Sequence, residues 1–217
     1  MTFKEIESKI LNYHQKGKRM FVTSSFQTHS IPLLHILSKI DAPVDVLFIN
    51  TGFHFPETII FRDKLAKQLD LNIIDVRSVI PKNLQRNSEG QFYFTTEPDY
   101  CCHINKTQPL EPFLMQYDIW VNGIRGDQNA NRKSMQIEQE APHNTMRFHP
   151  VLDWNSKMIY EYRQEHSLPE HPLEVQGYLS IGCEPCTRKF DVNDERSARW
   201  FGMNKTECGL HTDLASK

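Results

Sequence analysis

The five cysteines are the residues of this chain best suited to chemistry. Four of them form two close pairs, Cys101-Cys102 and Cys183-x-x-Cys186, while Cys208 stands alone near the C-terminal end. Four thiolates suit a tetrahedral soft-metal site or an iron–sulfur cluster. Neighbouring side chains diverge from one backbone, so the Cys101-Cys102 pair favours a cluster with separate irons over one zinc ion. A zinc site and buried core cysteines remain open as alternatives.

Cys208 is the cysteine left over from this quartet. A thiol attacks as its thiolate, and nearby cations raise the ionised fraction near neutral pH. Arg196 and Arg199 are spaced to share one helical face, and Lys205 and His211 are close in sequence. A reactive thiol and an incidental thiol on a surface helix are both compatible with this pattern.

The bulk composition describes one globular domain. The chain has 217 residues, of which 39% are hydrophobic and 24% charged, so we expect a single domain over 1–217 with 191–217 as a mobile C-terminal segment. A net charge of −2 gives no overall attraction to nucleic acid or to an anionic membrane. We therefore expect neither nucleic acid nor membrane among its partners.

The chemistry open to the cysteines also depends on the redox state of the cellular compartment. No apolar run approaches the roughly 20 residues that span a bilayer. The amphipathic start MTFKEIESKILNYHQKGKRM contains acids, so it resembles neither a signal peptide nor a transit peptide. We expect a cytoplasmic protein, and in a reducing compartment the cysteines are metal ligands or reactive thiols rather than disulfides.

The residues that could do chemistry must be positioned by an alternation of strands and helices. Apolar spacing predicts helices over about 2–15, 30–40, 56–69 and 155–166, the last with Asn155 as N-cap. Strands are predicted within 19–23, 44–50, 72–78, 117–125 and 146–154. This order is typical of an α/β fold with a doubly wound, mostly parallel sheet. From about Leu168 onward we expect loops and short helices that lie on the sheet.

Three polar turns follow predicted strands. TSSFQTHS opens a helix, where backbone N–H groups can hold an anion, and it has none of the glycines of a Walker P-loop. Asn50, Thr51 and Gly52 end the buried second strand, and Arg125 and Asp127 follow a later one. Such strand ends meet at one edge of a parallel sheet and would outline a nucleotide-sized cleft. The alternative for the first string is an ordinary capped turn.

These strings together resemble the assimilatory sulfonucleotide reductases, specifically the iron–sulfur adenylylsulfate (APS) reductases, over nearly the whole chain. FINTGFHFPET is similar to the family's Thr-Gly-x-x-Phe-Pro-Glu-Thr segment, and CCHINKTQPL to its Cys-Cys-x-x-x-Lys-x-x-Pro-Leu motif. GIRGDQN resembles Gly-x-Arg-x-x-Gln, SIGCEPCTR the second cysteine pair, and KTECGLH the terminal catalytic motif. The last two motifs are highly specific to the family.

The resemblance implies a fold like that of the adenine nucleotide alpha hydrolases and a 4Fe–4S cluster on Cys101, Cys102, Cys183 and Cys186. It implies Cys208 as the nucleophile, with His211 and Lys106 as further catalytic residues, Lys106 lying between cluster and substrate. The TSSFQTHS turn would take the place of a modified PP-loop. The implied substrate-binding residues are Ser24, Ser25, Phe26, Gln27, Thr28, Asn50, Thr51, Gly52, Arg125, Arg196 and Arg199. His54 near the second turn is either a ligand-contacting base or, more commonly for such a residue, structural.

The implied activity is thioredoxin-dependent reduction of adenylylsulfate to sulfite and AMP. Cys208 would displace AMP and become S-sulfocysteine, and a thioredoxin or glutaredoxin-like dithiol would release sulfite. A homo-oligomer is compatible with the sequence. Asn105 and Gly126 replace basic residues that are frequent in the family, and the first turn lacks the Ser-Gly-Gly of ATP-cleaving relatives.

Three other functions compete with this one. They are reduction of 3′-phosphoadenylylsulfate (PAPS), a PP-loop ATP pyrophosphatase such as a tRNA-thiolating sulfurtransferase, and a cluster- or zinc-bearing redox sensor. The missing Ser-Gly-Gly string and the near-neutral charge oppose the pyrophosphatase.

Overall fold

A six-stranded, mostly parallel sheet forms the centre of the computed structural model, which describes residues 1–189, 198–200 and 209–211. The strand order is β3-β2-β1-β4-β6-β5, and every pairing is parallel except that of β5 with β6. This arrangement confirms the predicted doubly wound α/β class. The strands are β1 (Met20–Thr23), β2 (Val44–Ile49), β3 (Ile73–Val76), β4 (Ile119–Asn122), β5 (Glu138–Glu140) and β6 (Met146–Phe148).

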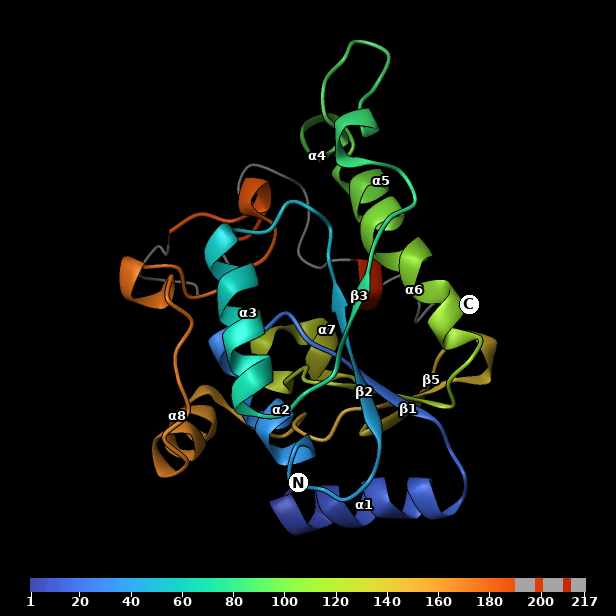
Figure 1. Cartoon of the computed structure of the whole chain (residues 1–217), viewed down its shortest axis with the longest axis vertical. Coiled ribbons are helices and arrows are strands. Elements are labelled where there is room, and N and C mark those ends of the chain that lie inside the picture. The colour runs from blue at the N-terminus through green and yellow to red at the C-terminus, as the bar shows by residue number, and fades with distance from the viewer. Residues whose placement is uncertain (190–197, 201–208, 212–217) are drawn as a thin grey trace.

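Four helices cover one face of the sheet. They contribute apolar side chains to the larger core cluster together with Val22, Val46 and Phe48 of the strands. Figure 1 shows α1 below the sheet and α3 beside it. These helices are α1 (Phe3–Gln15), α2 (Ile31–Leu37), α3 (Pro56–Gln68) and α8 (Ser156–Glu165).

The opposite face is covered by the last helix of a chain of short helices, whose earlier members rise away from the sheet in Figure 1. Leu110 and Leu114 of this chain pack with Phe21 and Trp120 of the strands, and Leu210 joins them from the C-terminal part. The elements are α4 (Tyr93–Thr96), α5 (Pro98–Cys102), the π-helical turn η3 (His103–Thr107), α6 (Gln108–Leu114) and the 3₁₀ turn η8 (Gly209–His211).

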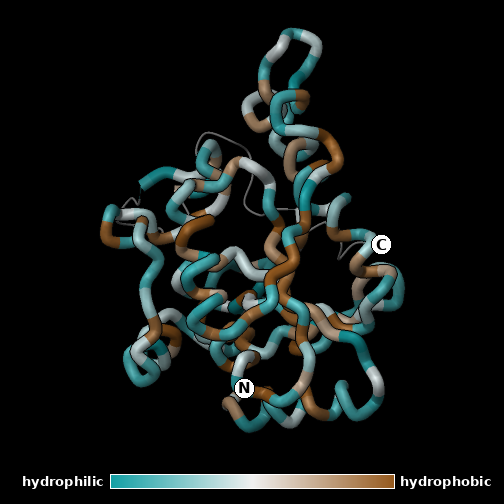
Figure 2. The backbone as a smooth tube through the Cα atoms, in the orientation of Figure 1, coloured by the Kyte–Doolittle hydropathy of each residue, from teal (hydrophilic) through white to brown (hydrophobic). Residues whose placement is uncertain are grey.

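Strand β2 shows why the sheet must be covered on both sides. Its buried residues alternate, since Val46 and Phe48 belong to one apolar cluster and Leu47 to the other. Figure 2 shows the hydrophobic stretches of the backbone concentrated in these central strands. A continuous apolar run is therefore the sequence signature of this doubly buried strand, as predicted.

Helix starts follow the expected capping chemistry. Thr2 and Glu5 form a capping box at the start of α1, and the Asn155 side chain accepts from the backbone N–H of Met158 at 3.0 Å. Pro32 and Pro56 stand in the first turns of α2 and α3. The predicted helix starts at these positions are confirmed.

The structure also contains elements that the sequence patterns did not predict. Helices α5 and α6 lie in a stretch with Pro98, Pro109 and Pro112, and strand β5 has two glutamates in three residues. Beyond Leu168 the described residues form the predicted loops and short helices. The remaining short elements are α7 (Ala130–Lys133) and the 3₁₀ turns η1 (Thr28–Ser30), η2 (Lys82–Leu84), η4 (Gly126–Gln128), η5 (Pro142–Asn144), η6 (Glu174–Gln176) and η7 (Glu184–Cys186).

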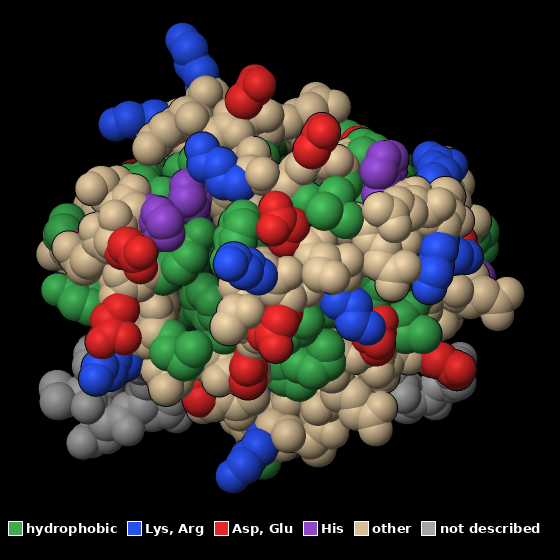
Figure 3. Space-filling model, turned by 90° about the horizontal axis from the view of Figure 1, so that it is seen from below, with side chains coloured by type: hydrophobic (Ala, Val, Ile, Leu, Met, Phe, Trp, Pro, Cys, Tyr) green, Lys and Arg blue, Asp and Glu red, His purple; other side chains and the backbone are tan. Residues whose placement is uncertain are grey.

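The surface is mixed in charge. Figure 3 shows basic and acidic side chains interspersed over the face seen from below. Within the described part of the chain, no helix has the length and apolar character needed to cross a membrane.

Candidate active site

A cavity of about 450 Å³ opens at the carboxyl ends of the central strands. Its wall includes Thr23 of β1, Ile49 of β2 and Asn122 of β4. The chain crosses from β1 to β2 on one side of this point and continues with β4 on the other, so the cavity lies at the topological switch point. Open α/β sheets bind ligands at this position, which makes the cavity the candidate active site.

The turn after β1 supplies polar groups to this cavity. Ser24, Ser25, Gln27 and Ser30 line it, and the Phe26 N–H donates to Ser24 Oγ at 3.1 Å. The Gln27 amide donates to Ser25 Oγ at 2.9 Å and accepts from the Ile181 N–H at 3.2 Å. The turn is therefore tied to the segment that precedes Cys183.

Phe26 and Thr28 belong to the same turn but are used for packing. Phe26 has a φ of 56° and no exposed surface, and its ring meets Phe48 edge-on at 5.8 Å. Thr28 donates to Glu174 and accepts from the His171 N–H at 3.0 Å. Neither residue is among those that line the cavity. Their substrate-binding role stays a prediction, and it could act only through the turn that they shape.

Arg125 lies at the end of the β4 segment and is 1% exposed. Its guanidinium contacts Asp127 at 3.0 Å and the Ser156 hydroxyl at 3.0 Å. Nη1 is buried without a hydrogen-bond partner among the described residues. A fixed cation with a spare donor in a cavity wall is suited to an anionic ligand. Arg132 of α7 lies nearby in the same wall.

Lys106 connects the large cavity with a second, smaller one. It belongs to the π-helical turn η3 and lines both cavities, as do Cys183 and Trp200. Single π-helical turns within α-helices often occur at functional sites. The role of Lys106 between the cysteines and a bound nucleotide stays a prediction.

The smaller cavity brings together the two cysteine pairs. Cys101, Cys102, Cys183 and Cys186 all line it, although the pairs are far apart in the chain. The η7 segment is fixed by the Glu184 N–H, which donates to the Phe53 carbonyl at 2.7 Å. On the other side, Asn105 donates to the Cys101 carbonyl at 2.9 Å and is itself paired with the buried Gln85.

Burial controls the ionisation of these thiols. Burial, and then the neighbouring thiols, raise the pKa of Cys101 to about 12, with Lys106 acting in the opposite direction. Burial and the nearby Cys183 raise the pKa of Cys186 to about 11. Soft metals bind thiolates, so loading this site would release protons. The described residues contain no group of three or more His, Cys, Asp or Glu side chains arranged to hold a single metal ion.

The turn after β2 lies beside the cysteines rather than in the large cavity. Thr51 Oγ1 is 3.2 Å from Cys183 Sγ and also accepts from the Phe53 N–H. Asn50 donates to Asp75, and Gly52 has a φ of 74°. None of Asn50, Thr51 and Gly52 lines the large cavity. Their substrate-binding role stays a prediction, and the positive φ alone explains the glycine.

His54 follows the same turn and lines the large cavity. Its Nε2 is 3.0 Å from the Ile49 carbonyl, and burial lowers its pKa to about 4. A neutral imidazole that bonds to the backbone fits the structural alternative for this residue.

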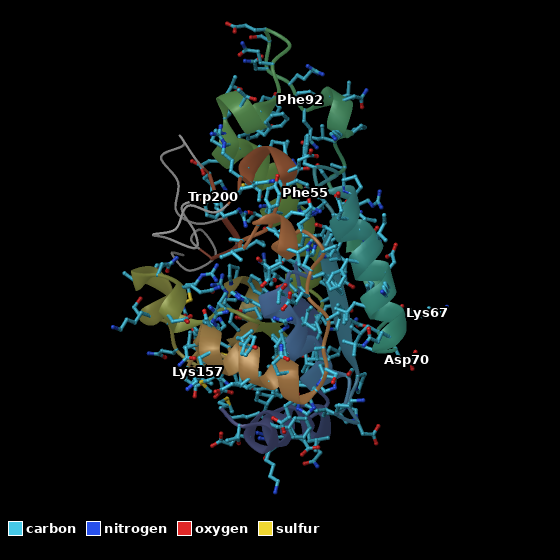
Figure 4. All side chains as sticks on the ribbon, turned by 90° about the vertical axis from the view of Figure 1, so that its left-hand side faces the viewer. Phe55, Lys67, Asp70, Phe92, Lys157 and Trp200 are labelled. Atoms are coloured by element: carbon cyan, nitrogen blue, oxygen red, sulfur yellow. The ribbon has the colours of Figure 1, made fainter. Side chains whose placement is uncertain are left out.

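The C-terminal residues of the predicted site are described only in part. Arg199 lines the large cavity, and its guanidinium lies 4.6 Å from the Trp200 ring. Figure 4 shows Trp200 at about the level of Phe55 and well above Lys157 of α8. Arg196 and Cys208, as well as most of the segment 191–217, lie outside the described residues, and of His211 only the backbone is described. Their predicted roles stay predictions.

Some residues of the site were not predicted. His29 and Asn122 line the large cavity, and Gln85 supports Asn105 behind the cysteines. Asn122 directly precedes Gly123 at the end of an apolar strand, which is the signal that could have drawn attention to it. Gln85 had no comparable signal, because it lies in a loop.

The mostly parallel sheet and the cavity at its switch point define an α/β domain with a candidate ligand site at the carboxyl ends of its strands. A crystal structure of phosphoadenylyl-sulfate reductase from Candida auris superimposes with a TM-score of 0.66 at 21% identity, covering 82% of this chain and 88% of that one. FMN adenylyltransferase from Candida glabrata shares the fold at a TM-score of 0.60 and 15% identity, with 92% of this chain and 66% of that one covered. At these identities the likeness concerns the fold alone.

The sequence comparisons identify the family. Residues 19–189 match the model of the phosphoadenosine phosphosulfate reductase domain, and the chain belongs to this family. It is 34% identical to a protein of Streptomyces coelicolor named adenosine 5′-phosphosulfate reductase, over 90% of this chain and 83% of that one. It is 36% identical to a protein of Gloeobacter violaceus named phosphoadenosine 5′-phosphosulfate reductase, over 90% and 83% of the two chains.

Proposed function

We propose that this protein reduces adenylylsulfate to sulfite and AMP in assimilatory sulfate reduction. The observation that carries the proposal is the pair of adjoining cavities, one suited to a nucleotide and one lined by four cysteines, with Lys106 in both walls. Family membership and relatives named adenosine 5′-phosphosulfate reductase support it.

The first step is attack of the Cys208 thiolate on the sulfur of the sulfuryl group. A bond forms between Cys208 Sγ and this sulfur, the bond from sulfur to the bridging oxygen breaks, and AMP leaves with the electron pair. The enzyme then carries S-sulfocysteine. Adenylylsulfate would be held by the polar turn of Ser24 to Ser30 and by cations of the cavity wall.

The two reactants of this step are both anions. At about 4 Å and an effective dielectric constant of about 20, two unit charges interact by about 4 kcal/mol. Arg125, Arg199 and Lys106 line the cavity and would offset this repulsion. Arginine suits phosphate and sulfuryl oxygens because its planar fork donates to two of them together.

The second step requires a dithiol of the thioredoxin or glutaredoxin class. One of its thiolates attacks Cys208 Sγ, sulfite leaves, and a mixed disulfide forms. The second thiol of the partner resolves this disulfide and returns Cys208 to the thiol form. The dithiol is oxidised to a disulfide and supplies both electrons of the reduction.

The four cysteines suit a 4Fe–4S cluster better than a mononuclear site. Consecutive residues of an α-helix point roughly 100° apart, so Cys101 and Cys102 of α5 suit ligation of two separate irons. Cys183 is the N-cap and Cys186 the last residue of the 3₁₀ turn η7, and both line the same small cavity. When bound, the cluster supplies a rigid link between these two segments and an electrostatic field beside the substrate.

Turnover assays with a thioredoxin system test the proposed activity. We expect sulfite and AMP from adenylylsulfate, much slower turnover of 3′-phosphoadenylylsulfate, and none with Cys208→Ser. Preference for the 3′-phosphorylated nucleotide would assign the competing function, which one of the named relatives has. Release of pyrophosphate from ATP would contradict the proposal altogether.

A further inference from the structure

Asn122 is a buried amide that the described residues leave without partners. Asn122 is the last residue of β4, it contributes to the wall of the large cavity, and it is 2% exposed. Neither Nδ2 nor Oδ1 forms a hydrogen bond within the described part of the chain. Buried amides are almost always hydrogen-bonded, because leaving them unpaired is costly. A ligand in the cavity is the natural partner.

The side of the sheet on which Asn122 lies can be fixed from its neighbours. Trp120 Nε1 donates to Thr23 Oγ1 at 2.8 Å, so Trp120 and Thr23 face the same side. Asn122 is two residues beyond Trp120 and therefore points to that side as well. This is the side covered by α6 and by Leu210, and the η3 turn that contains Lys106 immediately precedes α6.

The same side carries a buried positive charge. Arg147 of β6 is opposite Trp120 in the strand register, and its guanidinium lies 4.8 Å from the Trp120 ring. Arg147 is fully buried, and its Nε and Nη1 have no partner among the described residues. Its Nη2 donates to the Leu210 carbonyl at 3.4 Å. Arg147 does not itself line the cavity, but its buried charge beside Trp120 makes this side of the sheet more favourable for an anionic group.

The other side of the cavity is apolar where α2 and β2 line it, although Arg125 also reaches this side through its contact with Ser156 at the start of α8. Leu33 and Leu34 of α2 and Phe48 of β2 line it and belong to the apolar cluster of the opposite sheet face. An apolar wall suits the face of a nucleotide base. The polar end of the nucleotide would then be directed toward Lys106 and Asn122.

We propose that Asn122 Nδ2 donates a hydrogen bond to an oxygen of the sulfuryl group that is transferred. The inference rests on the proposed function, which supplies the sulfuryl-bearing nucleotide. Both amide orientations are open to Asn122 because neither atom is bonded, and an anionic ligand selects the one with Nδ2 toward it. Asn122 thereby helps to distinguish adenylylsulfate from its product AMP, which has no sulfuryl group.

Nucleotide binding tests this assignment without relying on turnover. All proteins carry Cys208→Ser, so that adenylylsulfate stays intact, and affinities for adenylylsulfate and AMP are measured by calorimetry. AMP is itself close to dianionic at neutral pH, so the comparison is not one of net charge alone. We expect Asn122→Asp to lower the affinity for adenylylsulfate by a factor at least ten times larger than the factor for AMP. For Asn122→Ala we expect this ratio to be about three.

Asn155→Asp is the matched control. It makes the same chemical change at the N-cap of α8, where aspartate also caps well, and Asn155 does not line the cavity. We expect it to leave both affinities unchanged. The sulfuryl assignment would be overturned if both Asn122 variants lowered the affinities for the two nucleotides equally. It would also be overturned if they lowered neither affinity. If the Cys208→Ser protein binds neither nucleotide, the proposed function itself falls and the assignment falls with it.

Discussion

At the scale of single residues, the sequence already separated four paired cysteines from the single Cys208. Spacing predicted a quartet of two pairs, and the structure brings these pairs to one small cavity. The contact of Thr51 with Cys183 could not be predicted, because it depends on how the β2 turn meets η7. The unpartnered state of Asn122 could not be predicted either, because hydrogen bonding follows from tertiary packing.

The quartet leads to a prediction about iron. Cys186→Ser removes one of four thiolates, and a serine hydroxyl is a poor ligand for a soft metal. We expect the variant to lose most of its iron and its visible absorption when purified without oxygen. Iron analysis and absorption spectroscopy provide the measurement.

Cys208→Ser is the control for this prediction, since it also removes one thiol. We expect it to keep its iron and its colour. If Cys186→Ser retained iron at the level of the unmodified protein, the quartet would not be the ligand set.

At the scale of elements, the turn after β1 and the segment before Cys183 act as one unit. Gln27 bonds to Ser25 within the turn and accepts from the Ile181 N–H across the cavity. Strands β1 to β4 and β6 and the four main helices were predicted because their apolar patterns are clear. Helices α5 and α6 were not, because Pro98, Pro109 and Pro112 resemble helix breakers although the first two occupy first turns.

Gln27→Glu tests this coupling. The carboxylate can still accept from the Ile181 N–H, but it cannot donate to Ser25 and it places a negative charge in a cavity proposed to bind an anion. We expect KM for adenylylsulfate to rise about tenfold, which corresponds to about 1.4 kcal/mol. Steady-state kinetics of sulfite formation provide the measurement.

Gln176→Glu is the matched control, because this exposed residue of η6 makes the same change outside the cavity. It should leave KM unchanged. An equal rise in KM for both variants would show that overall charge, rather than the turn, governs binding.

At the scale of the whole molecule, several buried or half-buried histidines are held in the neutral form. Burial lowers the pKa of His29, His54, His149 and His171 to about 4 in the folded protein. The antiparallel strand β5 links distant parts of the chain, since its Glu138 pairs with Lys9 of α1 at 2.9 Å. The sequence could not reveal this edge strand, because its carboxylates show no apolar alternation.

The histidines predict how stability depends on pH. An unfolded histidine titrates near 6.5, so between pH 6.5 and 4 the unfolded chain binds more protons than the folded one. The free energy of unfolding therefore falls as pH falls through this window. At pH 5 we expect a loss on the order of 1 kcal/mol for each such histidine relative to pH 7. Thermal or urea denaturation at the two pH values provides the measurement.

A variant of His171 tests the predicted pH dependence of stability at a single residue. Its Nδ1 accepts from the Leu173 N–H at 3.2 Å, and its Nε2 is 3.1 Å from the Thr58 hydroxyl, so protonation at Nδ1 would break a bond to the backbone. His171→Asn should be less stable at pH 7 but should lose less stability between pH 7 and pH 5. An unchanged pH dependence would show that His171 contributes nothing to it.

Mass spectrometry after incubation with adenylylsulfate, in the absence of any reductant, tests the central claim most directly. The account predicts one sulfonate on the peptide that contains Cys208, together with one equivalent of AMP in solution. A sulfonate confined to any other cysteine, or AMP release without modification of Cys208, would contradict it.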